Sequence, residues 1–332
     1  MDDSNGGHGS LPIPNRFHFV WFGQNFPKSS RLAIESCLTC CPGAEVILWH
    51  SDDLSQNADF RSLVRSGLAA RRLDAESAFG PAMQAQRAPF DVPRLKHIWN
   101  AVTSHVTRSN LARAILLYRY GGIYLDTDVL VVRDFEALRQ HQAFLGTERV
   151  VWPAWACRGW SVQRLLKSPL LGLLRKLSAT RRNGEWLIRK TSSWYPTAVN
   201  GAVLGSRAGH PFLAELLRKT SQVPEANWPL KHHLGTHVLQ DAVAAYQASD
   251  LKILSPDSFY PLGPEVSRQY FRAQSDPVEF AQRILSPETC AIHWYASVTD
   301  LASFSDAQWG ELMGRTIYGH LCAPYLSASA AE

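Results

Sequence analysis

One stretch of 25 residues, RSNLARAILLYRYGGIYLDTDVLVV at 108–132, limits the folds open to this chain more than any other. Its first half carries apolar residues at the three- and four-residue spacing of an amphipathic helix. Gly121 and Gly122 then end the helix, because glycine adopts positive φ without a Cβ penalty. The chain continues as a short apolar strand that ends at Asp126 and Asp128. A helix that turns sharply into a buried strand predicts an α/β protein.

The two aspartates at the end of this strand are candidate metal ligands. In an extended chain, residues i and i+2 point to the same side, so the carboxylates of Asp126 and Asp128 can converge on one hard cation. Within the predicted helix, Asn110 and Arg113 lie one turn apart on the same face and are expected to look toward the same pocket. A strand-end Asp-x-Asp alone is more typical of a turn or a helix cap. The glycine pair, the arginine and the apolar strand together favour a site.

The N-terminal part predicts a parallel sheet. Residues 16–22, RFHFVWF, are β-branched and aromatic and read as a strand. A helix over about 30–40 and a second strand over 44–49 complete a β-α-β unit, which implies parallel strands. The expected fold is therefore a mixed, mostly parallel sheet flanked by helices.

The domain organisation is expected to be simple. Residues 12–324 are predicted to form a single domain, with 54–108 as a helical insertion. The Gly-rich start 1–11 and the small-residue end 325–332 are expected to be flexible tails. The segment 155–196, rich in Trp, Arg and Ser, is predicted to be a mobile part near an acceptor.

Composition narrows the class of protein. The net charge of +5, from 34 basic and 29 acidic residues, is mild, and no basic patch interleaved with aromatics supports nucleic-acid binding. The sequence contains no run of about 18 apolar residues, so no transmembrane helix is predicted. Six cysteines lack the spacing of a zinc site or disulfide framework, which favours reduced thiols and a cytoplasmic location.

The helix start SNLAR at 109–113 and the run GGIYLDTD at 121–128 together resemble the Asp-x-Asp glycosyltransferases of the GT-A fold. The segments at 200–220 and 254–262 are similar to the α-1,4-galactosyltransferase and α-1,4-N-acetylglucosaminyltransferase group, glycosyltransferase family 32. The opening IPNRFHFVW at 13–21 resembles that of the glucosylating toxins. The chain departs from the pattern at Asn110, where the family usually has Asp, and at Thr236, where the group has Pro.

This resemblance implies a nucleotide-sugar site with a divalent cation, Mn²⁺ or Mg²⁺. Hard oxygen ligands and phosphate suit these ions better than zinc. Asp128 is expected to bind the metal directly, and Asp126 to reach the ribose or the metal. The implied donor-binding residues are Trp21, Asn110, Arg113, Tyr124, Asp126, Asn200, Gly235, Thr236 and Trp294, with His293 as a further metal ligand and Asp241 as a further catalytic candidate.

Some of these residues also have ordinary structural roles open to them. Trp21 reads equally as a core residue, Asn200 as part of an Asn-Gly turn, and His293 as a strand histidine with a structural partner.

The resemblance further implies transfer of a hexose, with retention and an α linkage, from a UDP-linked donor to a glycan, glycolipid or polysaccharide precursor. Front-face attack and a short-lived enzyme adduct both stay open as routes. The expected place of action is the cytoplasm, with peripheral association at the inner membrane face. Modification of a protein, as by bacterial effector toxins, is an alternative acceptor class.

Two other functions share the sequence features. A haloacid-dehalogenase-type phosphatase also uses Asp-x-Asp after an apolar strand, with the first Asp as nucleophile. That motif normally lies near the N-terminus and has Thr or Val where this chain has Leu130. A non-catalytic sugar-binding relative of the transferases is the second alternative, because Asn110 and Thr236 depart from the family pattern.

Overall fold

A computed structural model describes residues 12–80, 83, 88–152, 162–180, 184–230 and 232–327. The predicted N-terminal tail lies outside these residues, as does 328–332. None of the helices in the described ranges is both long enough and apolar enough to cross a bilayer.

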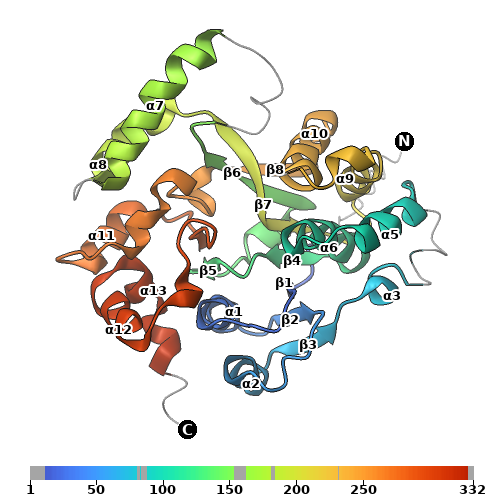
Figure 1. The fold of residues 1–332 in the computed structure, drawn as a ribbon, viewed down its shortest axis with the longest axis horizontal. Coiled ribbons are helices and arrows are strands. Elements are labelled where there is room, and N and C mark those ends of the chain that lie inside the picture. The colour runs from blue at the N-terminus through green and yellow to red at the C-terminus, as the bar shows by residue number, and fades with distance from the viewer. Residues whose placement is uncertain are drawn as a thin grey trace, which may run out of the picture.

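The centre of the molecule is a seven-stranded sheet in the order β3-β2-β1-β4-β7-β6-β8 (Figure 1). Strands β1–β2, β2–β3, β1–β4 and β6–β8 pair in parallel, whereas β7 pairs antiparallel with β4 and β6. This is the mixed, mostly parallel sheet predicted from the sequence. Its strands are β1 (Arg16–Trp21), β2 (Glu45–His50), β3 (Ala69–Arg72), β4 (Gly122–Leu125), β6 (Ala143–Arg149), β7 (Thr197–Ser206) and β8 (Leu251–Leu254).

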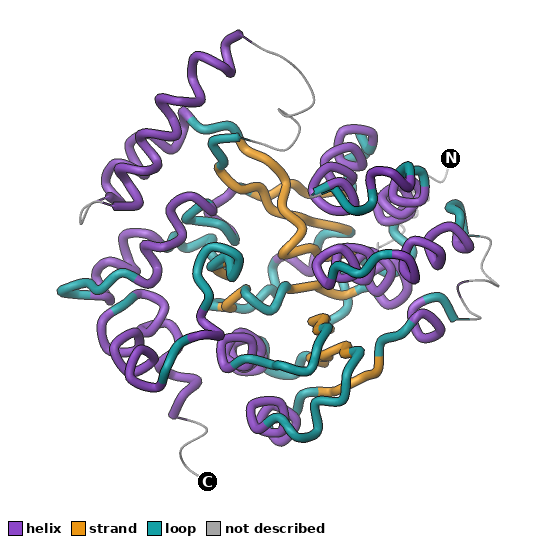
Figure 2. The backbone as a smooth tube through the Cα atoms, viewed as in Figure 1, coloured by secondary structure: helices purple, strands orange, loops and turns teal. Residues whose placement is uncertain are grey.

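Helices cover both faces of the sheet, as the tube drawing in Figure 2 shows. The N-terminal half contributes α1 (Lys28–Cys40), α2 (Ala58–Arg65), α3 (Ala75–Ala78), α5 (Val92–Ala101) and α6 (His105–Tyr120). The C-terminal half contributes α7 (Val162–Thr180), α8 (Gly184–Thr191), α9 (Pro211–Ser221), α10 (Val238–Ala245), α11 (Pro277–Ile284), α12 (Asp306–Arg315) and α13 (Ile317–Ser327).

Alternation along the strands divides the core between the two faces. On β1, Phe17 and Phe19 pack in one cluster with α1 and α2, while Val20 packs in another with α5, α6, α9 and α10. This follows from the two-residue side-chain period of a strand. A third cluster, around Trp294, joins α11, α12 and α13. Both faces of the sheet are thus buried, as expected for parallel strands.

The glycine pair makes the turn that the sequence predicted. Gly121 and Gly122 have φ of 62° and 106°. A Cβ on Gly122 would lie 2.5 Å from the carbonyl oxygen of Arg16, so no larger residue fits without displacing β1. Beneath the turn, buried His18 accepts from the Trp49 indole N–H at its Nδ1 (3.0 Å) and contacts the Gly121 carbonyl through Nε2 (2.8 Å). With Nδ1 an acceptor, Nε2 carries the proton and donates.

A second, two-stranded sheet lies beside the end of β4. It pairs β5 (Val129–Val131) antiparallel with β9 (Ala291–His293), and Val129 lies opposite His293. Strand β5 follows Asp128 directly, so this pairing brings the C-terminal part of the chain to the two aspartates.

The structure corrects two sequence predictions and gives the secondary structure of a third region. The region 54–108 is not purely helical, because residues 69–72 form β3 and extend the sheet parallel to β2. The described part of 155–196 consists mainly of α7 and α8, followed by a 3₁₀ turn at Ser192–Trp194, and its mobility stays a prediction. Tyr325 does not belong to a tail: it is 6% exposed in α13, and its hydroxyl donates to the carbonyl of Val131 at 3.3 Å.

Candidate active site

Asp126 lies directly after β4 and is held by two side chains from the same sequence motif. The Tyr124 hydroxyl donates to Asp126 Oδ1 at 2.6 Å, and Arg113 Nη2 donates to the same oxygen at 3.1 Å. The guanidinium also stacks on the Tyr124 ring, 4.8 Å from its centroid. Burial works against the charged form of Arg113, but Asp126, together with Tyr124, Tyr260 and Asp128, raises the pKa of Arg113 overall. Asp126 is therefore fixed in an orientation set by α6 and β4.

Asp128 is held from the other side, by the C-terminal part of the chain. Its Oδ2 lies 3.1 Å from His293 Nε2 and accepts from the Ala296 N–H at 2.8 Å. Burial alone would raise the pKa of Asp128, but the His293 imidazole and the Ala296 amide lower it overall. Burial would likewise lower the pKa of His293, and Asp128 raises it overall. The two side chains form a buried ion pair in this structure.

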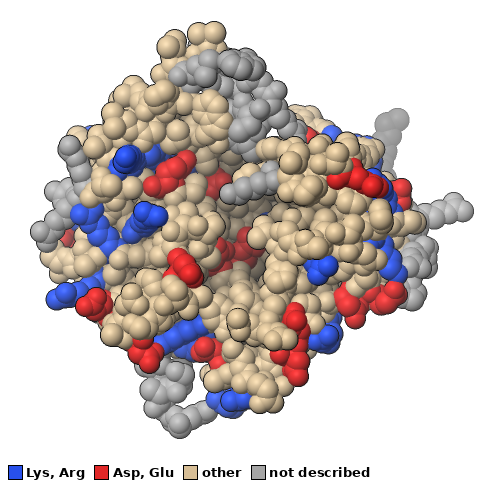
Figure 3. Space-filling model, viewed as in Figure 1, with Lys and Arg blue, Asp and Glu red and all other residues tan. Residues whose placement is uncertain are grey.

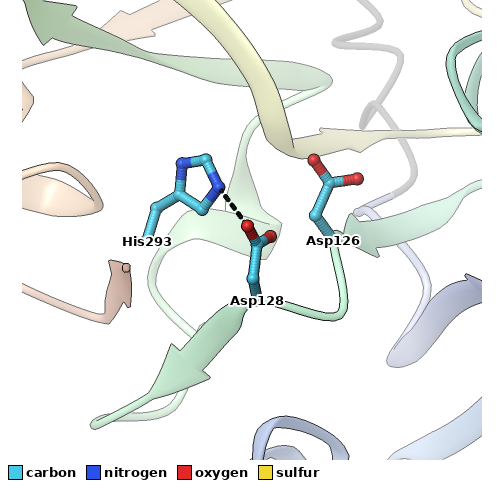
Figure 4. A group of neighbouring side chains, drawn as sticks. All are labelled: Asp126, Asp128 and His293. Atoms are coloured by element: carbon cyan, nitrogen blue, oxygen red, sulfur yellow. Dashed lines mark ion pairs between the residues drawn. The ribbon is translucent and has the colours of Figure 1, made fainter. Parts of the chain in front are cut away.

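Asp126, Asp128 and His293 form one group, with a ligand atom of each within 4.8 Å of the others (Figure 4). Among the described residues, no other group of three or more acidic, His or Cys side chains has this arrangement. Two carboxylates and an imidazole are a donor set that suits Mn²⁺. The three predicted metal ligands are thus brought together, and their chemistry fits a divalent cation.

A cavity of about 790 Å³ opens from Asp126. Figure 3 shows acidic side chains at the bottom of a hollow near the centre of this face. The polar part of the lining contains five more residues predicted to bind the donor, namely Asn110, Arg113, Asn200, Gly235 and Thr236. The rest is mostly apolar, with Val102, Leu204, Leu216, Trp228, Leu234, Val238 and Leu239. A largely apolar wall with a few convergent polar groups is the usual character of a small-molecule site.

Two glycines let the polar side chains approach the backbone of this cavity. A Cβ on Gly201 would lie 2.4 Å from Arg113 Nη1, and a Cβ on Gly235 would lie 2.5 Å from Asn110 Nδ2. Side chains at these two positions would push Arg113 and Asn110 out of place. Sequence reasoning singled out Gly235 and missed Gly201, although the Asn-Gly pair at 200–201 marks a close backbone approach.

Apart from the predicted metal ligands, four residues that were predicted to belong to the site do not line the main cavity: Trp294, Asp241, Tyr124 and Trp21. Trp294 is 2% exposed and packs against Phe271 and Tyr318, so the predicted contact with a nucleotide is not supported. Asp241 lines a separate cavity of about 240 Å³. The Tyr124 side chain is buried and acts through Asp126 instead of facing the cavity.

Trp21, predicted to stack on a uracil base, lies at the end of β1 and is partly buried. Its ring packs edge-on against Phe26, with centroids 5.4 Å apart, and it does not line the main cavity. Its stacking role stays a prediction.

A buried acid beside the site was missed from the sequence. Glu148 on β6 is 8% exposed, and Tyr295 donates to its Oε2 at 2.6 Å. The Tyr295 ring in turn lies 4.0 Å from the His293 ring, and Glu148 also accepts a hydrogen bond from Asn200. Burial raises the pKa of Glu148. Glu148 thus connects the metal-ligand side of the site to Asn200. Little in the sequence signals this role, because Glu148 lies between Thr147 and Arg149 at the polar end of β6.

Comparison with known proteins shows which family part of the chain resembles. Residues 27–145 match the family described as "Glycosyltransferase sugar-binding region containing DXD motif". Asp126 and Asp128 lie inside the matched region. This region of the chain is therefore similar to the sugar-binding region of the DXD-motif glycosyltransferases. The predicted resemblance to these glycosyltransferases is confirmed over the matched region, and the match does not favour the phosphatase alternative.

Two curated relatives come from Schizosaccharomyces pombe. Inositol phosphoceramide mannosyltransferase 3 is 22% identical over 209 residues, which cover 63% of this chain and 37% of the relative. Inositol phosphoceramide mannosyltransferase 2 is 27% identical over 128 residues, which cover 39% of this chain and 28% of the relative. The chain therefore spans well under half the length of either protein.

Two glycosyltransferases are among the solved structures to which this chain shows similarity. The galactosyltransferase LgtC, in complex with donor and acceptor sugar analogues, is 14% identical with a TM-score of 0.40, over 93% of this chain and 95% of that one. The UDP-bound glycosyltransferase domain of the YGT toxin is 11% identical with a TM-score of 0.43, over 96% and 91% of the two chains.

Proposed function

We propose that the protein transfers a hexose from a nucleotide sugar, with UDP as the nucleotide, to a glycan, glycolipid or polysaccharide-precursor acceptor, forming an α linkage with retention. The observation that carries the proposal is the convergence of Asp126, Asp128 and His293 beside a cavity that Asp126 also lines. If the diphosphate of the donor binds at these three side chains, the adjoining cavity is free to hold the sugar.

The three ligands would hold Mn²⁺ or Mg²⁺. Bound there, the cation would neutralise the charge that grows on the diphosphate leaving group. The protein's own contribution is to keep Asp126 and Asp128 in place. Tyr124 and Arg113 fix the first carboxylate, and Ala296 and His293 fix the second. Ligands with locked orientations need little reorganisation when the charge develops.

The cavity side chains orient the sugar and exclude water. Asn110 and Asn200 offer amide groups that can donate to or accept from sugar hydroxyls. Arg113 contributes a guanidinium whose Nε is buried without a hydrogen-bond partner in the described part of the chain. Apolar walls from α9, α10 and the turn before α10 reduce access of water to the reacting carbon. With Asn110 in place of Asp, the pocket has one negative charge fewer, which bears on donor choice.

The test is a panel of UDP-, GDP- and ADP-sugars incubated with the purified protein and Mn²⁺, Mg²⁺ or EDTA, with release of nucleoside diphosphate as the readout. One donor is expected to be turned over with metal and not with EDTA. Asp126→Asn and Asp128→Asn should each lower that turnover by at least about 100-fold. The matched control is Asp306→Asn on the exposed start of α12, which should retain turnover.

The outcomes are distinguishable from a protein that merely binds sugars. Calorimetric binding of a donor without turnover, across hydroxyl acceptors and water, would replace the enzyme by the non-catalytic alternative. Turnover that survives in Asp128→Asn would place the chemistry elsewhere. The predicted cytoplasmic location and the effector-type acceptor stay predictions.

A further inference from the structure

The outer face of α7 carries an exposed apolar stripe. Val162, Leu166, Leu170 and Leu173 are exposed by 73%, 75%, 55% and 54%. Their spacing of four, four and three residues places them on one face of the helix. In Figure 3 the surface at the upper left, where α7 lies in Figure 1, is largely tan. Four contiguous large apolar side chains in solvent are unusual on a helix of a globular protein.

The helix is docked in the molecule by its opposite face. Leu171, Arg175 and Ser178 are buried there, with exposures of 8%, 2% and 0%. Arg175 lies over the Tyr195 ring, 3.9 Å from its centroid, and Gln269 Nε2 donates to the Ser178 carbonyl at 2.6 Å. The orientation of α7 is thus set by specific contacts. The apolar stripe faces outward because polar contacts occupy the inner face.

Exposed tryptophans also lie before α7, on α8 and just after α8. Trp186 on α8 is 62% exposed, and Trp194, just after α8, is 59% exposed. Trp152, at the end of the segment before α7, is 45% exposed. Tryptophan is the residue most characteristic of a membrane–water interface, where its ring lies at headgroup level.

Cations flank the stripe. Lys167 and Lys176 are exposed, and the helical period places one on each side of the apolar face. The sequence from 162 to 194 contains eight Lys and Arg residues and one acidic residue, Glu185. Lysines beside an apolar face can extend their chains along it while the ammonium groups reach lipid phosphates. A second copy of this chain would bring the same positive charges together, so charge complementarity favours an anionic surface.

We propose that α7, α8 and Trp194 form a docking surface for a lipid bilayer that carries anionic headgroups. The apolar stripe enters the boundary between headgroups and acyl chains, and Lys167 and Lys176 contact the phosphates. This surface is separate from the candidate active site, and its binding does not depend on the proposed transfer reaction.

The test is co-sedimentation of the full-length protein with vesicles of phosphatidylcholine alone or mixed with phosphatidylglycerol. The wild type is expected to bind the anionic vesicles, and high salt should weaken the binding. The double variant Leu166→Glu/Leu170→Glu should lower the partition coefficient by roughly tenfold or more. Lys167→Glu/Lys176→Glu should remove the preference for phosphatidylglycerol.

The controls match the substitutions. Val278→Glu replaces an apolar residue that is 44% exposed on α11, and it should bind vesicles like the wild type. Asp128→Asn should also bind like the wild type, which separates this proposal from that of the transferase. Circular dichroism establishes that each variant is folded. Absence of vesicle binding by the wild type would overturn the proposal, as would equal binding by the folded Leu166→Glu/Leu170→Glu variant. A wild-type dimer that this variant converts to a monomer, without vesicle binding, would assign the stripe to a second copy instead.

Discussion

Helices α6 and α7 are both amphipathic, but their apolar residues face opposite environments. In α6 the apolar face is buried against the sheet, and the polar residues Asn110 and Arg113 line the cavity. In α7 the apolar stripe faces solvent, and the inner face holds Arg175 and Ser178. A helical period in the sequence therefore indicates that a stripe exists but not what it contacts. The residues that depart from the usual pattern are the ones assigned a function: the polar residues of α6 that face the cavity, and the apolar residues of α7 that face solvent.

The largest expected difference between the two helices is in stability. Leu117 on α6 is fully buried, and Leu117→Ala should lower the free energy of unfolding by about 2–5 kcal/mol. Leu170 on α7 is 55% exposed, and Leu170→Ala should change it by no more than about 0.5 kcal/mol. Urea unfolding of the two variants measures both values. A large loss from Leu170→Ala would mean that the outer face of α7 is packed within the protein.

The turn at the end of α6 makes stability depend on pH. Burial lowers the pKa of His18 to about 4 from its ordinary 6.5. As pH falls from about 6.5 to 4, the unfolded chain binds a proton that the folded chain does not, so folding weakens by about 3 kcal/mol in that window. Comparison with His18→Gln, which has no group titrating there, isolates this contribution. Parallel pH profiles of the two proteins would show that the pKa of His18 is the same in the folded and the unfolded chain.

The smallest expected effect is on the orientation of Asp126. Tyr124→Phe removes one hydrogen bond to a carboxylate and keeps the ring under Arg113. Turnover should fall by roughly tenfold, because a hydrogen bond to a charged group contributes about 1.5–3 kcal/mol. The Mn²⁺ concentration for half-maximal turnover should rise, whereas the unfolding midpoint should change little. Unchanged turnover and metal dependence would show that Arg113 alone positions Asp126.

Local patterns in the sequence were enough to predict much of this molecule. The first β-α-β unit, the glycine turn and the paired aspartates all depend on neighbours within a few residues, so their physical causes are visible in the sequence. The turn, for example, requires glycine because a Cβ would meet the backbone of β1.

Features that depend on distant parts of the chain were harder to predict. Strand β9 pairs with β5 across more than 150 residues, and only this pairing explains why His293 reaches Asp128. The predicted contact of Trp294 with the nucleotide conflicts with strand alternation, since neighbours on an extended chain point to opposite sides and His293 already faces the site. Strand β3 was not predicted, because its sequence AARR lacks the large apolar residues of a buried strand. It lies at the edge of the sheet, where such residues are not required.

The most direct measurement of the central claim is calorimetric titration of UDP into the protein with Mn²⁺ and with EDTA, repeated on Asp128→Asn and His293→Ala. We predict that UDP binds in the presence of Mn²⁺ and that EDTA abolishes the binding. Each variant should weaken the binding by at least about tenfold. Equal binding of UDP with and without metal, or unchanged Mn²⁺-dependent binding by both variants, would contradict the assignment of Asp126, Asp128 and His293 as a metal-dependent nucleotide site.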